Sequence, residues 1–262
     1  SYFGDGRRFK VKIKYFEAAE DFGTAGAVRL ACENIKEPIL VISADLLTDI
    51  NLAEVVKFHR QRRAVATMVL TRVENPLPYG IVITEKDCRI KNFLEKPSWG
   101  EVFSDTVNAG IYILESQAIN LIPCRRQFDF SHDLFPALLK ERKPLFGHTS
   151  SGYWCDIGKL EDYSRCHSDM LNGLVAFPVA GKRVDAFSLV GDETTMAKGA
   201  ELHNCVVGRN CKIGSGAFLR ECIIWDGVEI GPDARLERTI LTNDVKVGAR
   251  SDLGEGVVVG SE

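Results

Sequence analysis

The sequence predicts an α/β domain followed by a parallel β-helix, and two patterns carry this prediction. Up to about residue 172, short apolar runs rich in β-branched residues alternate with segments of helical spacing, as in α/β sheets with right-handed crossovers. From Val190 onward, apolar residues recur in steps of 6, 6 and 5, a period of 17 that is typical of hexapeptide repeats. We therefore expect an α/β domain at 1–172, a linker at 173–184 and a repeat domain at 185–262.

Composition narrows the function classes. The 262 residues are 45% hydrophobic and carry a net charge of -3 without a long basic run, which argues against nucleic acid as the main partner. There is no apolar run long enough for a membrane span and no signal-peptide pattern at the first residues, so we expect a cytoplasmic protein with no membrane partner. The eight cysteines include no CxxC pair, which argues against disulfides and zinc and predicts that most of them are buried free thiols.

The first residues predict an edge strand and then a helix. Residues 9–15 read FKVKIKY, an alternation typical of a half-exposed strand. A helix is expected from Thr24, its N-cap, to about Ile35, with Gly23 allowing a close approach of backbone. The start of this helix could hold a phosphate or the edge of a nucleotide, or it could be a plain capped helix.

Ile39 to Ser43 is predicted to be a central strand buried on both faces, and it ends near Asp45. A carboxylate at the carboxyl end of such a strand is either a ligand of metal or substrate or a cap of the following turn. The next helix is expected at 52–63, with His59 on its surface.

The following segments predict further strands and place polar residues at their ends. Strands are expected at 66–70, 79–83, 92–97 and 107–112, and helices at 131–140, capped by Ser131, and at 160–171. The residues that stand out are the neighbouring pair Glu95 and Lys96, the small residues after Asn108, and Asp156, an isolated acid that follows an aromatic residue.

The repeat predicts which residues stack. Residues 17 apart should lie on adjacent coils, so Cys205 and Cys222 are expected to be neighbouring free thiols about 4.8 Å apart. The apolar residues expected to point inward are Val190, Met196 and Leu202, then Val207, Ile213 and Leu219, then Ile224, Ile230 and Leu236, then Leu241, Val247 and Leu253.

Several short motifs occur in a characteristic order. They are FGTAG (22–26), VISAD (41–45), YG (79–80), FLEKP (93–97), NAGIY (108–112), FDFSHDLFPALL (128–139) and GYWCDIGKLEDY (152–163), followed by the hexapeptide tail. This order resembles that of the sugar-1-phosphate nucleotidylyltransferases, and within them that of the mannose-1-phosphate guanylyltransferases.

The resemblance implies a Rossmann-like nucleotidyltransferase domain, a left-handed parallel β-helix, and a reaction that joins a nucleoside triphosphate to a sugar 1-phosphate with release of pyrophosphate. It implies GDP-mannose as the preferred product and Mg²⁺ as the cofactor, since hard oxygen ligands suit that ion. It also implies roles for matching residues: Asp45 and Asp156 for Mg²⁺, Glu95 for sugar hydroxyls, Lys96 for the sugar phosphate, Gly80, Asn108 and Gly110 for the sugar pocket, and Gly23 and Thr24 for the base pocket.

Two departures from the family pattern bear on activity. Members of the family begin with a glycine-rich triphosphate loop reading like GGxGTRLxPLT, which does not occur among the 262 residues, and Ala44 stands where the family often has glycine. We therefore expect the α/β domain to be N-terminally incomplete and this chain to have little or no transferase activity. The alternative is a non-catalytic regulatory or assembly subunit. Exposed coil edges predict a homo-oligomer or a further C-terminal domain.

Overall fold

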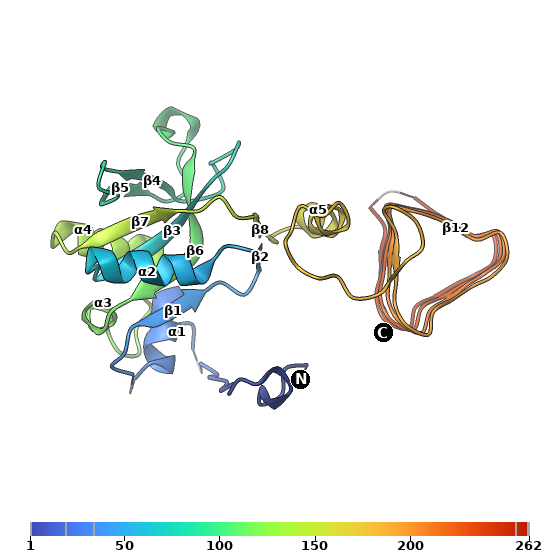
Figure 1. Cartoon of the computed structure of the whole chain (residues 1–262), viewed down its shortest axis with the longest axis horizontal. Coiled ribbons are helices and arrows are strands. Elements are labelled where there is room, and N and C mark those ends of the chain that lie inside the picture. Colours follow the sequence, from blue (N-terminus) through green and yellow to red (C-terminus); the bar gives the residue numbers. More distant parts are fainter. Residues whose placement is uncertain (1, 19, 34, 255, 261–262) are drawn as a thin grey trace. The chain divides into compact units, whose positions relative to one another are not determined.

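A computed structural model describes residues 2–18, 20–33, 35–254 and 256–260 of the chain (Figure 1). Two units are distinguished, one with residues 1–46 and 50–154 and the other with 47–49 and 155–262. The helix α5 (Leu160–Leu171) groups with the β-helix in this division. The domain boundaries expected at 172 and 184 stay a prediction.

The first unit is built on a mixed sheet. β6 (Thr106–Leu114) lies in the middle, antiparallel to β3 (Ala66–Arg72) on one edge and to β1 (Ile39–Ile42) and β4 (Ile81–Thr84) on the other. β5 (Ile90–Leu94) extends the sheet beyond β4, and β7 (Leu145–Thr149) pairs in parallel with β3. β1 and β3 thus run in the same direction with β6 between them, so the expected α/β sheet is present with antiparallel strands inserted.

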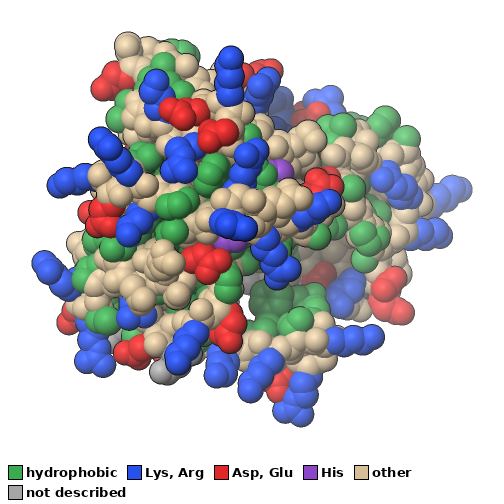
Figure 2. Space-filling model, turned by 60° about the vertical axis from the view of Figure 1, so that its left-hand side comes forward, with side chains coloured by type: hydrophobic (Ala, Val, Ile, Leu, Met, Phe, Trp, Pro, Cys, Tyr) green, Lys and Arg blue, Asp and Glu red, His purple; other side chains and the backbone are tan. Residues whose placement is uncertain are grey.

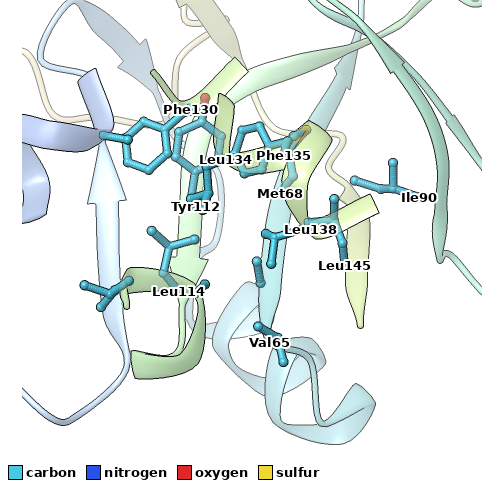
Figure 3. Packing of buried hydrophobic residues seen from close by; sticks show 14 of the residues in the cluster. Val65, Met68, Ile90, Tyr112, Leu114, Phe130, Leu134, Phe135, Leu138 and Leu145 are labelled. Atoms are coloured by element: carbon cyan, nitrogen blue, oxygen red, sulfur yellow. The ribbon is translucent and has the colours of Figure 1, made fainter. Parts of the chain in front are cut away.

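Helices cover both faces of this sheet, as alternation along the strands requires. Met68 and Leu70 join a cluster with α1 (Gly23–Ala31), α3 (Ser116–Ile119), η3 (Phe130–Leu134) and α4 (Phe135–Lys140). Figure 3 shows the rings of Phe130, Tyr112 and Phe135 side by side in this cluster. On the opposite face, Val69 packs in a second cluster with α2 (Leu52–Arg62). Short helical turns lie at η1 (Arg7–Phe9) and η2 (Trp99–Glu101).

One predicted strand is absent and another differs in its burial. The strand expected at 9–15 does not form: Phe9 ends η1, and residues 10–15 are in no strand. β1 is not buried on both faces: Leu40 is 41% and Ile42 44% exposed. β1 pairs only with β6 among the described strands, so Asp45 follows an edge strand rather than a central one.

His59 is buried, contrary to the expected surface position. It is 3% exposed, and it follows Val55 by one helical turn on the inner face of α2. Its ring lies 2.8 Å from the Thr67 hydroxyl and 3.2 Å from the Glu115 carboxylate. The helix pattern showed only apolar neighbours, whereas these polar partners come from β3 and from the end of β6, which the pattern does not show.

The second unit contains the predicted parallel β-helix, whose triangular coils are visible in Figure 1. Every predicted inward position lies in register with its counterpart 17 residues away, for example Leu202 with Leu219 and Leu219 with Leu236. One face has β10 (Leu189–Val190), β13 (Val206–Val207), β16 (Ile223–Ile224), β19 (Ile240–Leu241) and β22 (Val258–Val259), with β9 (Lys182–Arg183) antiparallel at its edge; the second has β11 (Thr195–Met196), β14 (Lys212–Ile213), β17 (Glu229–Ile230) and β20 (Lys246–Val247); the third has β12 (Glu201–His203), β15 (Phe218–Arg220), β18 (Arg235–Glu237) and β21 (Asp252–Leu253).

The corners of the coils turn through left-handed backbone. One corner uses Asn204, Glu221 and Arg238, each with φ between 47° and 55°, at intervals of 17 residues.

The prediction for Cys205 and Cys222 is confirmed: both are free and buried on adjacent coils, and the Cys222 amide donates to the Cys205 sulfur over 3.5 Å. A separate pair of short strands, β2 (Leu46–Thr48) and β8 (Trp154–Asp156), has residues 47–48 and 155–156 in this second unit.

One outer face of the β-helix is apolar. Leu189, Ile223 and Ile240 point away from the core and yet are at most 8% exposed, whereas the corresponding outward positions of another face include Lys212, Glu229 and Lys246. α5 faces this apolar surface, and the two line a cavity of about 690 Å³ whose residues include Ile223 and Ile240. The sequence distinguishes this face only by its second apolar column, which the repeat prediction did not use.

Removal of the Leu219 side chain should destabilise the β-helix strongly. Leu219 is fully buried in the inward column, so Leu219→Ala should lower the free energy of unfolding by about 2–5 kcal/mol through lost contacts and a cavity. Hydrogen exchange of the β13–β18 amides under increasing urea would measure it. Lys212→Ala is the control, because Lys212 lies on the exposed side of its strand and solvent screens its ion pair with Glu229. Equal losses in the two variants would contradict the packing described.

Candidate functional site

Gly80, Glu95 and Lys96 meet where β5 ends and β4 begins. Glu95 and Lys96 directly follow β5, and the Lys96 amide donates to the Tyr79 carbonyl over 3.2 Å. Lys96 adopts a φ of 44°, a left-handed conformation that is uncommon for a residue with a Cβ atom. Its side chain is exposed, so the ammonium group is available to an anion.

The Glu95 carboxylate has a buried oxygen without a protein partner. Its Oε2 atom is buried and makes no hydrogen bond, although buried acceptors are normally satisfied. It lies over Gly80, where a Cβ atom would be 2.5 Å from Oε2 and 2.8 Å from the Phe93 ring. A glycine is therefore required here for the carboxylate to take this position, and the free acceptor is suited to a ligand hydroxyl.

Asn108 and Gly110 lie in β6 at an irregular point of the sheet. The Asn108 amide donates to the Gly80 carbonyl over 2.8 Å, which joins this strand to the Gly80–Glu95 group. The Asn108 side chain accepts from the Gly110 amide over 3.0 Å and donates to the Tyr112 hydroxyl over 2.8 Å. Five predicted site residues of the first unit are thus connected through strand ends and backbone hydrogen bonds.

Tyr112 keeps its proton. Burial raises the pKa of Tyr112 well above its usual value, the hydrogen bond from Asn108 partly opposes this shift, and the nearby Glu95 charge adds to it. A neutral phenol can accept from the Asn108 amide and still offer its own proton. Sequence reasoning missed Tyr112 as a site residue, although it is the last residue of the NAGIY motif.

The predicted metal ligands lie in different units. Asp45 is exposed in the turn after β1, and Asp156 ends β8 in the second unit. Carboxylates suit Mg²⁺, and one or two carboxylates are sufficient because the ion commonly retains several water ligands. Among the described residues, no group of three or more His, Cys, Asp or Glu side chains could hold a metal by itself. The donors present fit Mg²⁺ chemically, and the ligand set stays a prediction.

Gly23 and Thr24 are held by the segment before η3. The Thr24 hydroxyl donates to Asp129 over 2.6 Å, and the Ala25 and Gly26 amides both donate to the Phe128 carbonyl over 3.0 Å. These contacts occupy amides that an anion at the helix start would use. A Cβ atom on Gly23, whose φ is +67°, would lie 2.8 Å from that same carbonyl.

Two predicted helix caps are wrong. The N-cap residue of α1 is Phe22 without a side-chain cap, because the Thr24 hydroxyl is bonded to Asp129 instead. The helix expected at 131–140 is capped by Asp129 rather than Ser131, and it begins as the π-helix η3. Burial alone would raise the pKa of Asp129, but hydrogen bonds from Thr24 and from the amides after it hold that pKa below its usual value. The roles of Gly23 and Thr24 in nucleotide binding stay a prediction.

Comparison with known proteins agrees with these motifs. Residues 1–173 match the nucleotidyl transferase family. The chain belongs to this family. Residues 179–262 match the family described as the EIF2B subunit epsilon LbH domain, in agreement with the left-handed β-helix.

Three curated relatives show what the chain is similar to. It is 33% identical to a mannose-1-phosphate guanylyltransferase of Mycobacterium tuberculosis, over 80% of this chain and 59% of the relative. It is 36% identical to a UTP--glucose-1-phosphate uridylyltransferase of Synechocystis, over 62% of this chain and 46% of the relative. It is 32% identical to a probable mannose-1-phosphate guanylyltransferase 3 of Arabidopsis thaliana, over 64% of this chain and 51% of the relative. The chain thus spans about half the length of the relatives it matches.

Gly80→Ala should disturb the fold locally. The added methyl group would meet Glu95 and Phe93 at less than contact distance, so the free energy of unfolding should fall by about 1–3 kcal/mol. Urea denaturation would measure the change. Gly100→Ala is the matched control, because a Cβ atom at Gly100 has no neighbour within 4 Å. An equally stable Gly80→Ala variant would contradict the close approach of Glu95.

Tyr112 should make the fold sensitive to alkali. Because the folded pKa of Tyr112 is raised, the unfolded chain loses this proton at a lower pH than the folded chain does. Stability from this group is present below the unfolded pKa of about 10 and is lost as the pH rises through the folded value. Urea midpoints of the wild type should fall more steeply above about pH 10 than those of Tyr112→Phe. Equal slopes would contradict the shift.

Proposed function

We propose that this protein is a sugar-1-phosphate nucleotidyltransferase that makes an NDP-sugar, by preference GDP-mannose, and pyrophosphate. Membership of the nucleotidyl transferase family and the guanylyltransferase relatives support this activity. The observation that carries it is the buried, unpartnered Glu95 oxygen above Gly80. A free acceptor in that position matches the role that the resemblance assigns to Glu95, which is to bind sugar hydroxyls.

The residues of the first unit suit the sugar phosphate. Glu95 would accept from hydroxyls, Asn108 and the backbone of Gly80 and Gly110 would form the pocket around the ring, and the exposed Lys96 would neutralise the phosphate. The phosphate oxygen would attack the α-phosphorus of the nucleoside triphosphate in line, forming one P–O bond while the bond to the pyrophosphate breaks. The nucleophile is already ionised, so alignment and charge neutralisation matter more than a general base.

The remaining assignments stay part of the proposal. Asp45 and Asp156 are the predicted ligands of Mg²⁺, which when bound would neutralise charge on the phosphates. Gly23 and Thr24 are the predicted base-pocket residues. The little or no transferase activity expected of these 262 residues also stays a prediction, so binding rather than turnover is the suitable test.

Partners and location are proposed on the same basis. In the described part of the chain, no helix has the length and apolar character that crossing a bilayer requires. Figure 2 shows Lys and Arg side chains scattered among Asp and Glu side chains over the visible face, whereas a nucleic-acid site needs clustered positive charge. We propose small-molecule substrates, a cytoplasmic location, and a homo-oligomer or a further C-terminal domain.

A second function is favoured by the tail. Residues 179–262 match a domain of the EIF2B epsilon subunit, so a non-catalytic regulatory or assembly role is the alternative. The two functions differ in one observable property, because the alternative does not require the Glu95 and Lys96 group to bind a sugar phosphate.

Calorimetric titration with mannose 1-phosphate would test the proposed function. The wild-type chain should bind, and Lys96→Ala should weaken binding about 10- to 100-fold, since a hydrogen bond to a charged group contributes about 1.5–3 kcal/mol. Lys91→Ala is the matched control, because Lys91 is an exposed lysine of β5. If the wild type bound neither mannose nor glucose 1-phosphate, the regulatory or assembly function would be preferred.

A further inference from the structure

A β-bulge interrupts β6 beside the sugar-phosphate residues. Met68 of β3 faces Tyr112, and Leu70 faces Asn108, so Val69 alone faces the three residues between Asn108 and Tyr112. Gly110, in the middle of these three, has a φ of +70°. Such bulges redirect side chains and remove backbone groups from the sheet ladder, and those groups need other partners when they are buried.

Three hydrogen bonds supply those partners. The Gly110 amide donates to the Asn108 side chain over 3.0 Å, and the Gly110 carbonyl accepts from the Ser43 amide over 3.0 Å. The Ala109 carbonyl accepts from the indole Nε1 of Trp154 over 2.9 Å. The third of these bonds is the only one of the three that comes from a side chain distant in the sequence.

Trp154 also contacts Tyr79, the residue before Gly80. Its ring lies edge to face with Tyr79, with 5.2 Å between the ring centroids. Tyr79 precedes Gly80, and its carbonyl accepts from the Lys96 amide. The indole itself packs against the apolar cluster that contains Ala109 and Val55. Trp154 therefore joins the Gly80–Lys96 side to the Asn108–Gly110 side through one rigid ring.

We propose that Trp154 is a positioning residue for sugar 1-phosphate, acting through the Ala109 carbonyl and the Tyr79 ring. This inference rests on the proposed function of the same site. The indole N–H holds the Ala109–Gly110 peptide in the bulge, and the bulge fixes the direction of the Asn108 side chain. Without the N–H group, a buried carbonyl is left unsatisfied and the bulge relaxes.

Trp154→Phe tests the inference, because it keeps an aromatic ring and removes the N–H group. The dissociation constant for mannose 1-phosphate should rise about tenfold, as the loss of one hydrogen bond predicts. The ratio of the constants for mannose and glucose 1-phosphate should also change, and the Gly110 amide resonance should move in ¹H–¹⁵N spectra. A merely structural tryptophan would lower the melting temperature without changing that ratio.

Trp225→Phe is the matched control, because the Trp225 indole also donates a hydrogen bond, over 3.2 Å to the Tyr163 hydroxyl, but in the second unit. It should leave both dissociation constants and the Gly110 resonance unchanged. If Trp154→Phe does not fold, 3-benzothienylalanine at position 154 removes the N–H group and keeps the bicyclic shape.

The outcomes separate the two proposals. Unchanged constants in Trp154→Phe, with normal binding by the wild type, would overturn the role of Trp154 and leave the proposed function intact. No binding by the wild type would overturn the proposed function. In that case an unmoved Gly110 resonance would overturn the positioning by Trp154 as well, and a moved one would support it.

Discussion

The candidate site depends on the bulge in β6. A regular strand would pair each residue from Asn108 to Tyr112 in step with one residue of β3. The bulge instead places three residues opposite Val69 and lets the Asn108 side chain bond both the Gly110 amide and the Tyr112 hydroxyl. This arrangement costs ladder hydrogen bonds with β3. The Trp154 indole bonds the Ala109 carbonyl, and Ser43, which follows β1, bonds the Gly110 carbonyl.

The unsatisfied Glu95 oxygen is understandable in this setting. A buried carboxylate oxygen without a donor costs free energy, and nothing in the fold of β4 and β5 requires a carboxylate here. The carboxylate nevertheless occupies space that a Cβ atom at position 80 would fill, so only glycine fits there. Local strain and incomplete hydrogen bonding of this kind are typical of functional sites, which is why this oxygen outweighs any single motif in the functional argument.

The sequence predicted periodic features better than features that depend on distant partners. The register of the β-helix followed from its 17-residue period, because each coil repeats one pattern and contacts only its neighbours. The cap Thr24, the surface position of His59 and the two-sided burial of β1 were wrong because each depends on residues far away in the chain. The cap Ser131 was wrong by two residues, since the neighbouring Asp129 takes that role. Gly110 was recognised as a small residue, but a bulge is visible only once β3 and β6 are paired. Tyr112 and Trp154 lie within the NAGIY and GYWCDIGKLEDY motifs, but the sequence alone does not show which hydrogen bonds these side chains make.

The coil period also sets how the length of the β-helix can vary between related proteins. Since Leu202, Leu219 and Leu236 stack at intervals of 17 residues, an insertion or deletion of 17 residues adds or removes one coil and leaves all three inward columns continuous. Any other change of length within a coil would rotate the later side chains out of the core, unless a corner loop absorbed the extra residues. Length differences among homologues are therefore expected in multiples of 17 or at the corners, such as the one formed by Asn204, Glu221 and Arg238.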